Sequence, residues 1–333
     1  MNAEIQEAAS RLISSHLVWD NHGCLPLRWD DDRFLPQLAR YRDSGMDAVS
    51  INVGFGEQGI EEHVRVIAAF RHWLLSRPED YLLIRTAGDV ALARETGRLG
   101  VCFDIEGARG IGNQLSLIQL YYDLGVRWML MAYNHRNLVG DGVHDPDEQG
   151  LTAFGTEVVA EMERVGMVVC CSHTGPRTAR EVMERATRPV IFSHSNAKAL
   201  WPNRRNIDDE LMDACAATGG VVGINGLDQF LGPRGSSVEA MIRHIDYVAQ
   251  RIGVDHVGIG LDYVFDMQEL VEWTREMHRK HPDNPDWEEP MKFVAPEQLQ
   301  EIVAGLLRMK YSEEDITRIL GGNHLRIAQQ VWK

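Results

Sequence analysis

The chain lacks three features that mark large classes of proteins. Its 333 residues contain no apolar run of membrane-spanning length and only five cysteines, an odd number. The sequence therefore predicts neither a membrane-spanning helix nor a disulfide framework. Basic residues are also few, since 34 Lys and Arg stand against 49 Asp and Glu, for a net charge of -15. Because phosphate binding requires clustered cations, we expect no nucleic-acid partner.

Two further signals are missing at the level of the whole chain. Residues 1–16 read MNAEIQEAASRLISSH, which is the pattern of an amphipathic helix with early acids and not of a secretion signal. We therefore expect a cytoplasmic protein whose partners are small molecules. No linker or shift in composition divides the sequence, so it predicts a single domain over residues 1–333.

Eight short apolar runs are present, and each has the composition of a buried β-strand. They cover residues 17–21, 47–53, 99–104, 126–131, 166–171, 189–193, 220–224 and 256–260. Helical patterns lie between most of them, among them residues 59–76, 151–166, 207–219 and 237–253. Alternating strands and helices predict an α/β fold with parallel strands, a (β/α)8 TIM-like barrel with extra C-terminal helices.

Two segments follow the last predicted strand. Residues 281–293, HPDNPDWEEPMKF, are rich in Pro, Asp and Trp, and we expect them to form a long loop that overhangs the barrel mouth. Residues 312–332 have the pattern of two closing helices separated by Gly321 and Gly322.

Five of the apolar runs end at a residue that can bind a metal or transfer a proton. These residues are His22, Glu106, His173, His194 and Asp262. In a parallel barrel, side chains at the C-terminal ends of the strands meet at one mouth, so we expect the five to lie together. Three imidazoles and a carboxylate suit Zn²⁺.

The two carboxylates of this set have different expected roles. Glu106 leaves a buried strand, where a carboxylate is costly unless it is paired or bound to a cation. It can bridge two metal ions, and the alternative is a salt bridge to an arginine. Asp262 closes the last strand, where we expect the general base that takes a proton from a metal-activated water.

The sequence around these residues resembles the membrane (renal) dipeptidase family, the M19 metallopeptidases, within the amidohydrolase-like barrels. The resemblance covers nearly the whole chain. It rests on DIEG at Glu106, SH at His173, PVIFSHSNAKAL at His194, RRNIDDEL at Arg205, GIGLD at Asp262 and GGNHLRI near the C-terminus. SHSNA followed by RN is its most specific element.

The resemblance implies a function and a role for each matched residue. It implies a zinc-dependent dipeptidase with two zinc ions bridged by Glu106. His173 and His194 then bind the second ion, and Arg205 holds the free carboxylate of a dipeptide, which its planar fork suits. The resemblance also implies tolerance of a D-configured C-terminal residue and a homodimer.

The sequence departs from the family pattern at three positions. The His-x-Asp pair of the first metal reads His22-Gly23-Cys24, so Cys24 either ligates zinc as a thiolate, leaves that site weak or empty, or is inert. Tyr133 stands where the family has a histidine that steadies the substrate's carbonyl oxygen, and it can donate one hydrogen bond there. CCSH replaces Asp-x-Ser-His before His173.

Two alternatives to the dipeptidase remain open on the sequence. One is a related amidohydrolase acting on another N-acyl amino acid, cyclic amide or lactone, since a fold does not determine a substrate. The other is a non-catalytic metal-binding relative whose first metal site has decayed at Cys24. The presence of Arg205 and Asp262 with the remaining ligands argues against decay, because a decayed site has no physical need for them.

Overall fold

The computed structural model describes residues 2–233, 235, 237–280 and 291–333. Within these residues, eight parallel strands form the centre of the molecule. They are β1 (Trp19–Cys24), β2 (Ala48–Phe55), β4 (Leu99–Glu106), β5 (Val126–Leu130), β6 (Val168–Cys170), β7 (Val190–Ile191), β8 (Val222–Ile224) and β9 (Val257–Ile259). Each predicted run contains or overlaps one of these strands.

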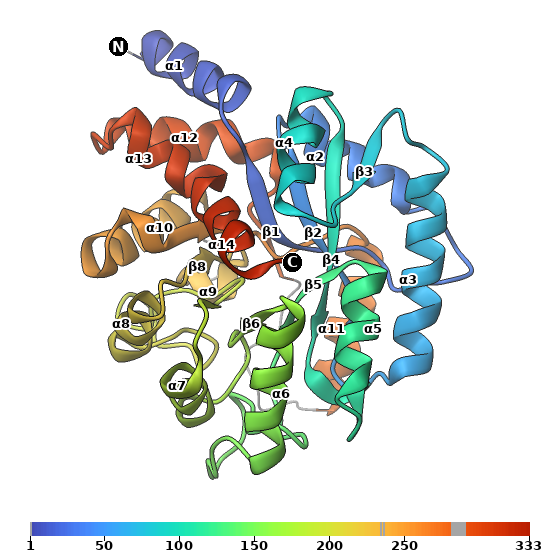
Figure 1. The fold of residues 1–333 in the computed structure, drawn as a ribbon. Helices are drawn as coiled ribbons and strands as arrows, with labels where there is room; N and C mark the ends of the chain where they lie inside the picture. Colours follow the sequence, from blue (N-terminus) through green and yellow to red (C-terminus); the bar gives the residue numbers. More distant parts are fainter. Residues whose placement is uncertain (1, 234, 236, 281–290) are drawn as a thin grey trace.

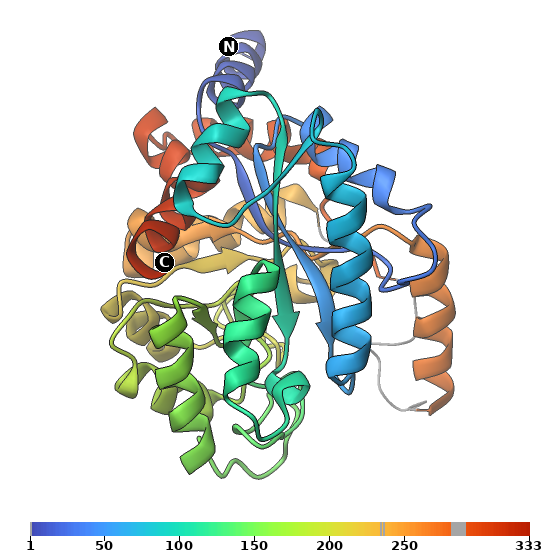
Figure 2. The same ribbon diagram turned by 45° about the vertical axis from the view of Figure 1, so that its right-hand side comes forward.

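The strands form a nearly closed barrel. Their order is β7-β6-β5-β4-β2-β1-β9-β8, and a parallel bridge between Phe192 and Val222 joins the two ends of the sheet. Helices surround the strands, as Figures 1 and 2 show. The predicted (β/α)8 fold is therefore confirmed.

Two short strands were not predicted. β3 (Tyr81–Leu83) pairs with the beginning of β4, and β10 (Tyr263–Val264) pairs with the end of β1. Segments of two or three residues are too short to show a strand periodicity, so the sequence carries no signal for them.

The helices lie around the strands and at the ends of the barrel. They are α1 (Asn2–Ser15), α2 (Ala39–Asp43), α3 (Ile60–Leu75), α4 (Ala87–Glu95), α5 (Ser116–Leu124), α6 (Ala153–Val165), α7 (Pro176–Arg185), α8 (Asp209–Ala217), α9 (Asp228–Leu231), α10 (Val238–Ile252), α11 (Met267–Lys280), α12 (Leu299–Arg308), α13 (Glu313–Thr317) and α14 (Asn323–Val331). The four predicted helical patterns correspond to α3, α6, α8 and α10. None of the helices in the described residues is long and apolar enough to cross a membrane.

α14 closes the N-terminal end of the barrel. Its Ile327 and Val331 pack in a buried cluster with Trp128 and other side chains of β5 and β6, and its Ala328 packs with Trp19. Figure 1 shows α14 and the C-terminus over the strands. One end of the barrel is therefore filled by core packing, and the opposite end is left for chemistry.

Two predictions about the C-terminal region have different outcomes. The two closing helices are present as α13 and α14, joined by a π-helical turn over Arg318–Gly322. Gly321 in this turn lies close to the backbone of Leu17, where a Cβ would come within 2.7 Å of the carbonyl oxygen. Most of the loop expected over the barrel mouth, residues 281–290, lies outside the described residues.

Candidate metal centre and active site

The five strand-end residues converge at the C-terminal end of the barrel. His22 and Glu106 lie on β1 and β4, and the other three follow β6, β7 and β9. Oε1 of Glu106 lies 3.2 Å from Nε2 of His173, 3.2 Å from Nε2 of His194 and 3.6 Å from Nε2 of His22. Among the described residues, the ion pairs of Glu106 are thus to histidines and not to an arginine.

Three ligand atoms form a triangle on one side of Glu106. Sγ of Cys24 lies 3.5 Å from Nε2 of His22 and 3.5 Å from Oδ1 of Asp262, and the last two atoms are 3.4 Å apart. Ligands bound at about 2.0 to 2.3 Å around a tetrahedral ion lie about 3.3 to 3.8 Å from one another. The triangle, with Glu106 as a fourth ligand, therefore has the dimensions of a zinc site, and we call these four residues the first metal group.

A second set of ligand atoms lies on the other side of Glu106. The carboxylate and the imidazoles of His173 and His194 lie within 4.8 Å of one another, and the two Nε2 atoms are 2.9 Å apart. Two imidazole nitrogens at this distance require a proton or a cation between them. We call Glu106, His173 and His194 the second metal group.

Each imidazole is held through its other nitrogen. A hydrogen bond at Nδ1 fixes the tautomer and leaves Nε2 free to coordinate, an arrangement typical of metal-binding histidines. The partners of His22, His173 and His194 are Asp104 Oδ2 at 3.3 Å, Asn134 Oδ1 at 2.8 Å and Ser193 Oγ at 2.8 Å. The sequence reading missed these three residues, although Asp104 stands two positions before Glu106 and therefore on the same face of β4.

The backbone at the mouth adopts a rare conformation. Among the described residues, the non-glycine residues with positive φ are Asn134 (59°), His173 (60°), Asp262 (57°) and Lys310 (66°), and the first three belong to the site. Such residues are strained and cluster at functional sites. The turn at Asp262 directs its carboxylate into the mouth, where Nδ2 of Asn225 donates to Oδ2 at 2.9 Å.

The pKa shifts of the buried ligands follow from their surroundings. Burial lowers the pKa of His173 and His194 well below its ordinary value, so both are neutral and able to coordinate. Burial raises the pKa of Cys24, and it raises the pKa of Glu106 to about 8 against the opposing effect of His22. A bound cation favours the thiolate and the carboxylate and so opposes both of these shifts.

Tyr133 lies beside the second metal group. Its ring stacks on that of His173, with 4.3 Å between the ring centroids. Burial raises the pKa of Tyr133, and the charges of Glu106 and Asp262 raise it further. The hydroxyl therefore keeps its proton and is available as a hydrogen-bond donor near both carboxylates.

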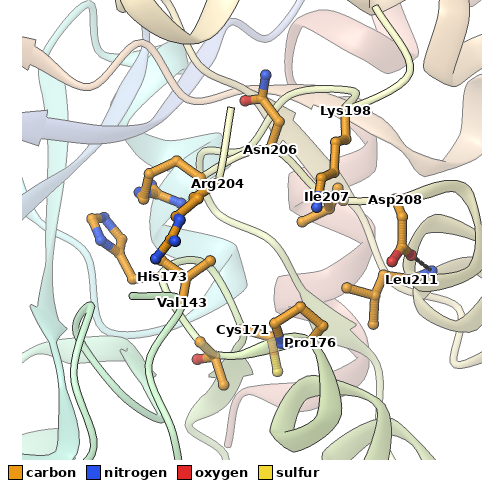
Figure 3. A pocket seen from close by; sticks show the side chains of 12 residues that line it. Val143, Cys171, His173, Pro176, Lys198, Arg204, Asn206, Ile207, Asp208 and Leu211 are labelled. Carbon is orange, nitrogen blue, oxygen red and sulfur yellow. Dashed lines mark hydrogen bonds between the residues drawn. The ribbon is translucent and has the colours of Figure 1, made fainter. Parts of the chain in front are cut away.

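Arg205 lies buried on the other side of His173 and His194. Its Nη2 donates to the carbonyl oxygen of His194 at 3.4 Å, while its buried Nε has no partner among the described residues. Arg205 and His173 also line a small cavity that is partly open to solvent (Figure 3). An unpaired guanidinium donor at such a cavity is suited to bind an anion.

Comparisons with known sequences agree with this arrangement. A family model described as membrane dipeptidase (peptidase family M19) matches residues 9–279. The dipeptidase verJ of Clonostachys rogersoniana is 31% identical over 263 residues, which are 78% of this chain and 63% of that protein. The chain spans between 54% and 63% of the length of the first curated relatives that it matches.

Comparisons with solved structures agree on the fold. An amidohydrolase from Pseudomonas aeruginosa superposes with a TM-score of 0.86 at 26% identity, covering 97% of this chain and 99% of that one. A metallo peptidase from Rhodobacter sphaeroides, liganded with a phosphinate mimic of the dipeptide L-Ala-D-Ala, superposes with a TM-score of 0.77 at 21% identity, covering 95% and 99%. The barrel is thus shared over nearly the full length of each chain.

Proposed function

We propose that this chain, which belongs to the membrane dipeptidase family, peptidase family M19, is a metal-dependent dipeptidase. The observation that carries the proposal is the position of Oε1 of Glu106, within 3.6 Å of three imidazole Nε2 atoms from three different strand ends. Arg205, with its unpaired Nε, lies at the same mouth. Two metal groups beside a carboxylate-binding arginine suit a short substrate with a free C-terminus.

The proposed cofactor is a pair of zinc ions, one in each metal group. Imidazole nitrogen and carboxylate oxygen suit zinc, and the thiolate of Cys24 makes the first metal group softer than one that contains only oxygen and nitrogen. We propose that Cys24 is a working ligand, because its Sγ lies 3.5 Å from both His22 Nε2 and Asp262 Oδ1.

The side chains around the metal groups have separate tasks in the proposed reaction. When bound, the ions polarise the scissile carbonyl and lower the pKa of the attacking water. Asp262, held through Oδ2 by Asn225, accepts the proton of that water on its carboxylate and returns it to the leaving amine. Tyr133 donates a hydrogen bond to the carbonyl oxygen as negative charge develops there, and Arg205 binds the substrate's carboxylate.

The first test measures zinc per chain and the hydrolysis of L,L and L,D dipeptides. We expect about two zinc ions, one for each metal group, together with turnover. Fully metal-loaded protein that hydrolyses no dipeptide but does hydrolyse N-acyl amino acids, cyclic amides or lactones would contradict the proposal and favour the related amidohydrolase. Inactivity on all of these would favour the non-catalytic relative.

The role of Cys24 has a test that does not depend on activity. Cobalt-substituted protein should show a sulfur-to-cobalt charge-transfer absorption that is lost in Cys24→Asp, while the number of bound ions is kept. Cys102→Ser is the matched control, because Cys102 is buried on β4 away from the ligand atoms. An absorption that persists in Cys24→Asp would contradict ligation by Cys24. The cytoplasmic location and the homodimer stay predictions.

A further inference from the structure

Three cations line the cavity beside His173. They are Lys198, Arg204 and Arg205. Arg205 is buried, and Lys198 and Arg204 are exposed. Within the described part of the chain, neither Lys198 nor Arg204 forms an ion pair or a side-chain hydrogen bond. The protein as a whole carries a net charge of -15, so three cations at one cavity, none of them in a close ion pair among the described residues, are a local reversal of its charge.

The one acid that lines this cavity is engaged elsewhere. Oδ1 of Asp208 accepts a hydrogen bond from the backbone nitrogen of Leu211 at 2.9 Å, as the N-cap of α8. Figure 3 shows this bond, with Lys198 beside Asp208 on one side of the cavity and Arg204 toward His173 on the other. The cavity therefore has an excess of positive charge, which attracts an anionic ligand.

Much of the remaining wall is apolar, beside the polar Thr174 and Asn206. The apolar part includes the side chains of Val143, Cys171, Pro176, Ile207 and Leu211. An apolar wall with cations around it fits a short aliphatic stem that ends in a carboxylate. The wall removes the stem from water, and the cations form ion pairs with the carboxylate. The side chains of aspartate and glutamate have this form.

We propose that the enzyme prefers dipeptides whose C-terminal residue carries a second carboxylate, and that Lys198 and Arg204 determine this specificity. The inference rests on the proposed dipeptidase function. Arg205 binds the main-chain carboxylate, and Lys198 and Arg204 line the same cavity as Arg205, which puts them within reach of the side chain of that same residue.

The test compares substrates that differ only in charge. The pairs are L-Ala-D-Glu with L-Ala-D-Gln, and L-Ala-L-Glu with L-Ala-L-Gln, assayed with zinc-loaded protein. We expect kcat/KM to be about tenfold or more higher for the glutamate member of the hydrolysed pair, as charged hydrogen bonds allow. Added salt should reduce this ratio. Equal rates on both members would overturn the specificity and leave the dipeptidase proposal standing.

Variants then assign the effect to the two cations. Arg204→Gln and Lys198→Gln should lower the ratio toward one, because the rate on the glutamate substrate falls more than the rate on the glutamine substrate. Arg204→Glu should lower the ratio further. Arg243→Gln, an equal charge change at an exposed position of α10, is the control and should change neither rate. A ratio that does not change in the Arg204 and Lys198 variants would contradict their role.

A binding measurement separates this inference from the proposed function. Titration calorimetry with free glutamate and free glutamine, as product analogues, does not require turnover. Glutamate binding that weakens about tenfold in Arg204→Gln would support the cavity as a carboxylate site even if no dipeptide were hydrolysed. Equal binding of glutamate by the wild type and Arg204→Gln would overturn it.

Discussion

The two ends of the barrel use the same strands for different purposes. On β1, Trp19 is buried in the core toward the N-terminal end, while His22 and Cys24 belong to the first metal group. On β4, Cys102 packs in the same core cluster as Trp19, and Glu106 lies between the two metal groups. At the N-terminal end, packed apolar surface stabilises the protein. At the C-terminal end, the burial of carboxylate and thiol groups is unfavourable unless a cation is bound beside them. Substitutions at the two ends should therefore affect different measurements.

The largest effect should come from Glu106→Gln, at the C-terminal end. The amide keeps the size of the side chain but cannot supply the negative charge that two metal ions share. We expect kcat to fall by about 10⁴-fold, the scale seen when a principal catalytic group is removed, and the zinc content to fall with it. The melting temperature of the metal-free protein should not fall, because burial already disfavours the charged form of Glu106, with its pKa raised to about 8. Retained activity with a lower melting temperature would place Glu106 among the core residues.

Ile327→Ala should have the opposite result at the N-terminal end. Ile327 is 4% exposed and packs with Trp128 and Val331. Removing its buried side-chain atoms should cost about 2 to 5 kcal/mol of the free energy of unfolding, and Ile327→Val about 1 kcal/mol. Urea unfolding measures the loss, and kcat per folded molecule should stay unchanged. A fall in kcat at temperatures where the variant is fully folded would show that the two ends are coupled.

Asp104→Asn tests a residue between the two ends. Oδ2 of Asp104 accepts a hydrogen bond from Ser50 Oγ at 2.8 Å and a second one from His22 Nδ1 at 3.3 Å. Loss of such a partner behind a metal-binding histidine typically costs about 10- to 100-fold in metal affinity or activity. Zinc titration of the variant measures the effect, with Ser50→Ala as the milder control. An unchanged zinc affinity would restrict Asp104 to a packing role.

The sequence located the residues that converge at the barrel mouth better than it located their hydrogen-bond partners. Glu106, His173, His194 and Asp262 could be predicted because each ends an apolar run, and the topology of a parallel barrel then brings strand ends together. The role of Asp104 as the hydrogen-bond partner of His22 could not be predicted. The two residues are 82 positions apart, and neither motif shows how their strands are aligned.

The resemblance to the family also did not distinguish residues at the N-terminal end of the barrel from residues at its C-terminal end. The GGNHLRI motif is one of the motifs that carry the resemblance, beside those of the metal groups. In the structure this motif begins α14, where Asn323 Nδ2 donates to the carbonyl oxygens of Val254 and Val257 at 2.7 and 2.8 Å. A match in sequence does not distinguish a residue that holds the barrel together from one that binds metal.

The smallest effect should be a change in the pH dependence of stability, from His324 in α14. His324 is buried, and its Nε2 lies 3.1 Å from the carbonyl oxygen of Ile259, to which the neutral ring donates. Burial lowers the pKa of His324 from 6.5 to about 4. Between these values the unfolded chain binds the proton and the folded chain does not. The free energy of unfolding therefore falls as the pH falls through this window, by at most about 1.4 kcal/mol per pH unit for this one group.

His324→Gln keeps a donor near the Ile259 carbonyl and removes the titration. Urea unfolding of the metal-free protein between pH 7 and pH 4.5 should therefore show a slope smaller by up to one proton than that of the wild type. His63 and His244 also take up protons on unfolding in this pH range, since burial lowers the pKa of each to about 4 in the folded protein, so a residual slope is expected. Equal slopes would mean that the pKa of His324 is not lowered in the folded protein. The pH profile of kcat should not change, because no ligand atom of the metal groups is altered at the N-terminal end.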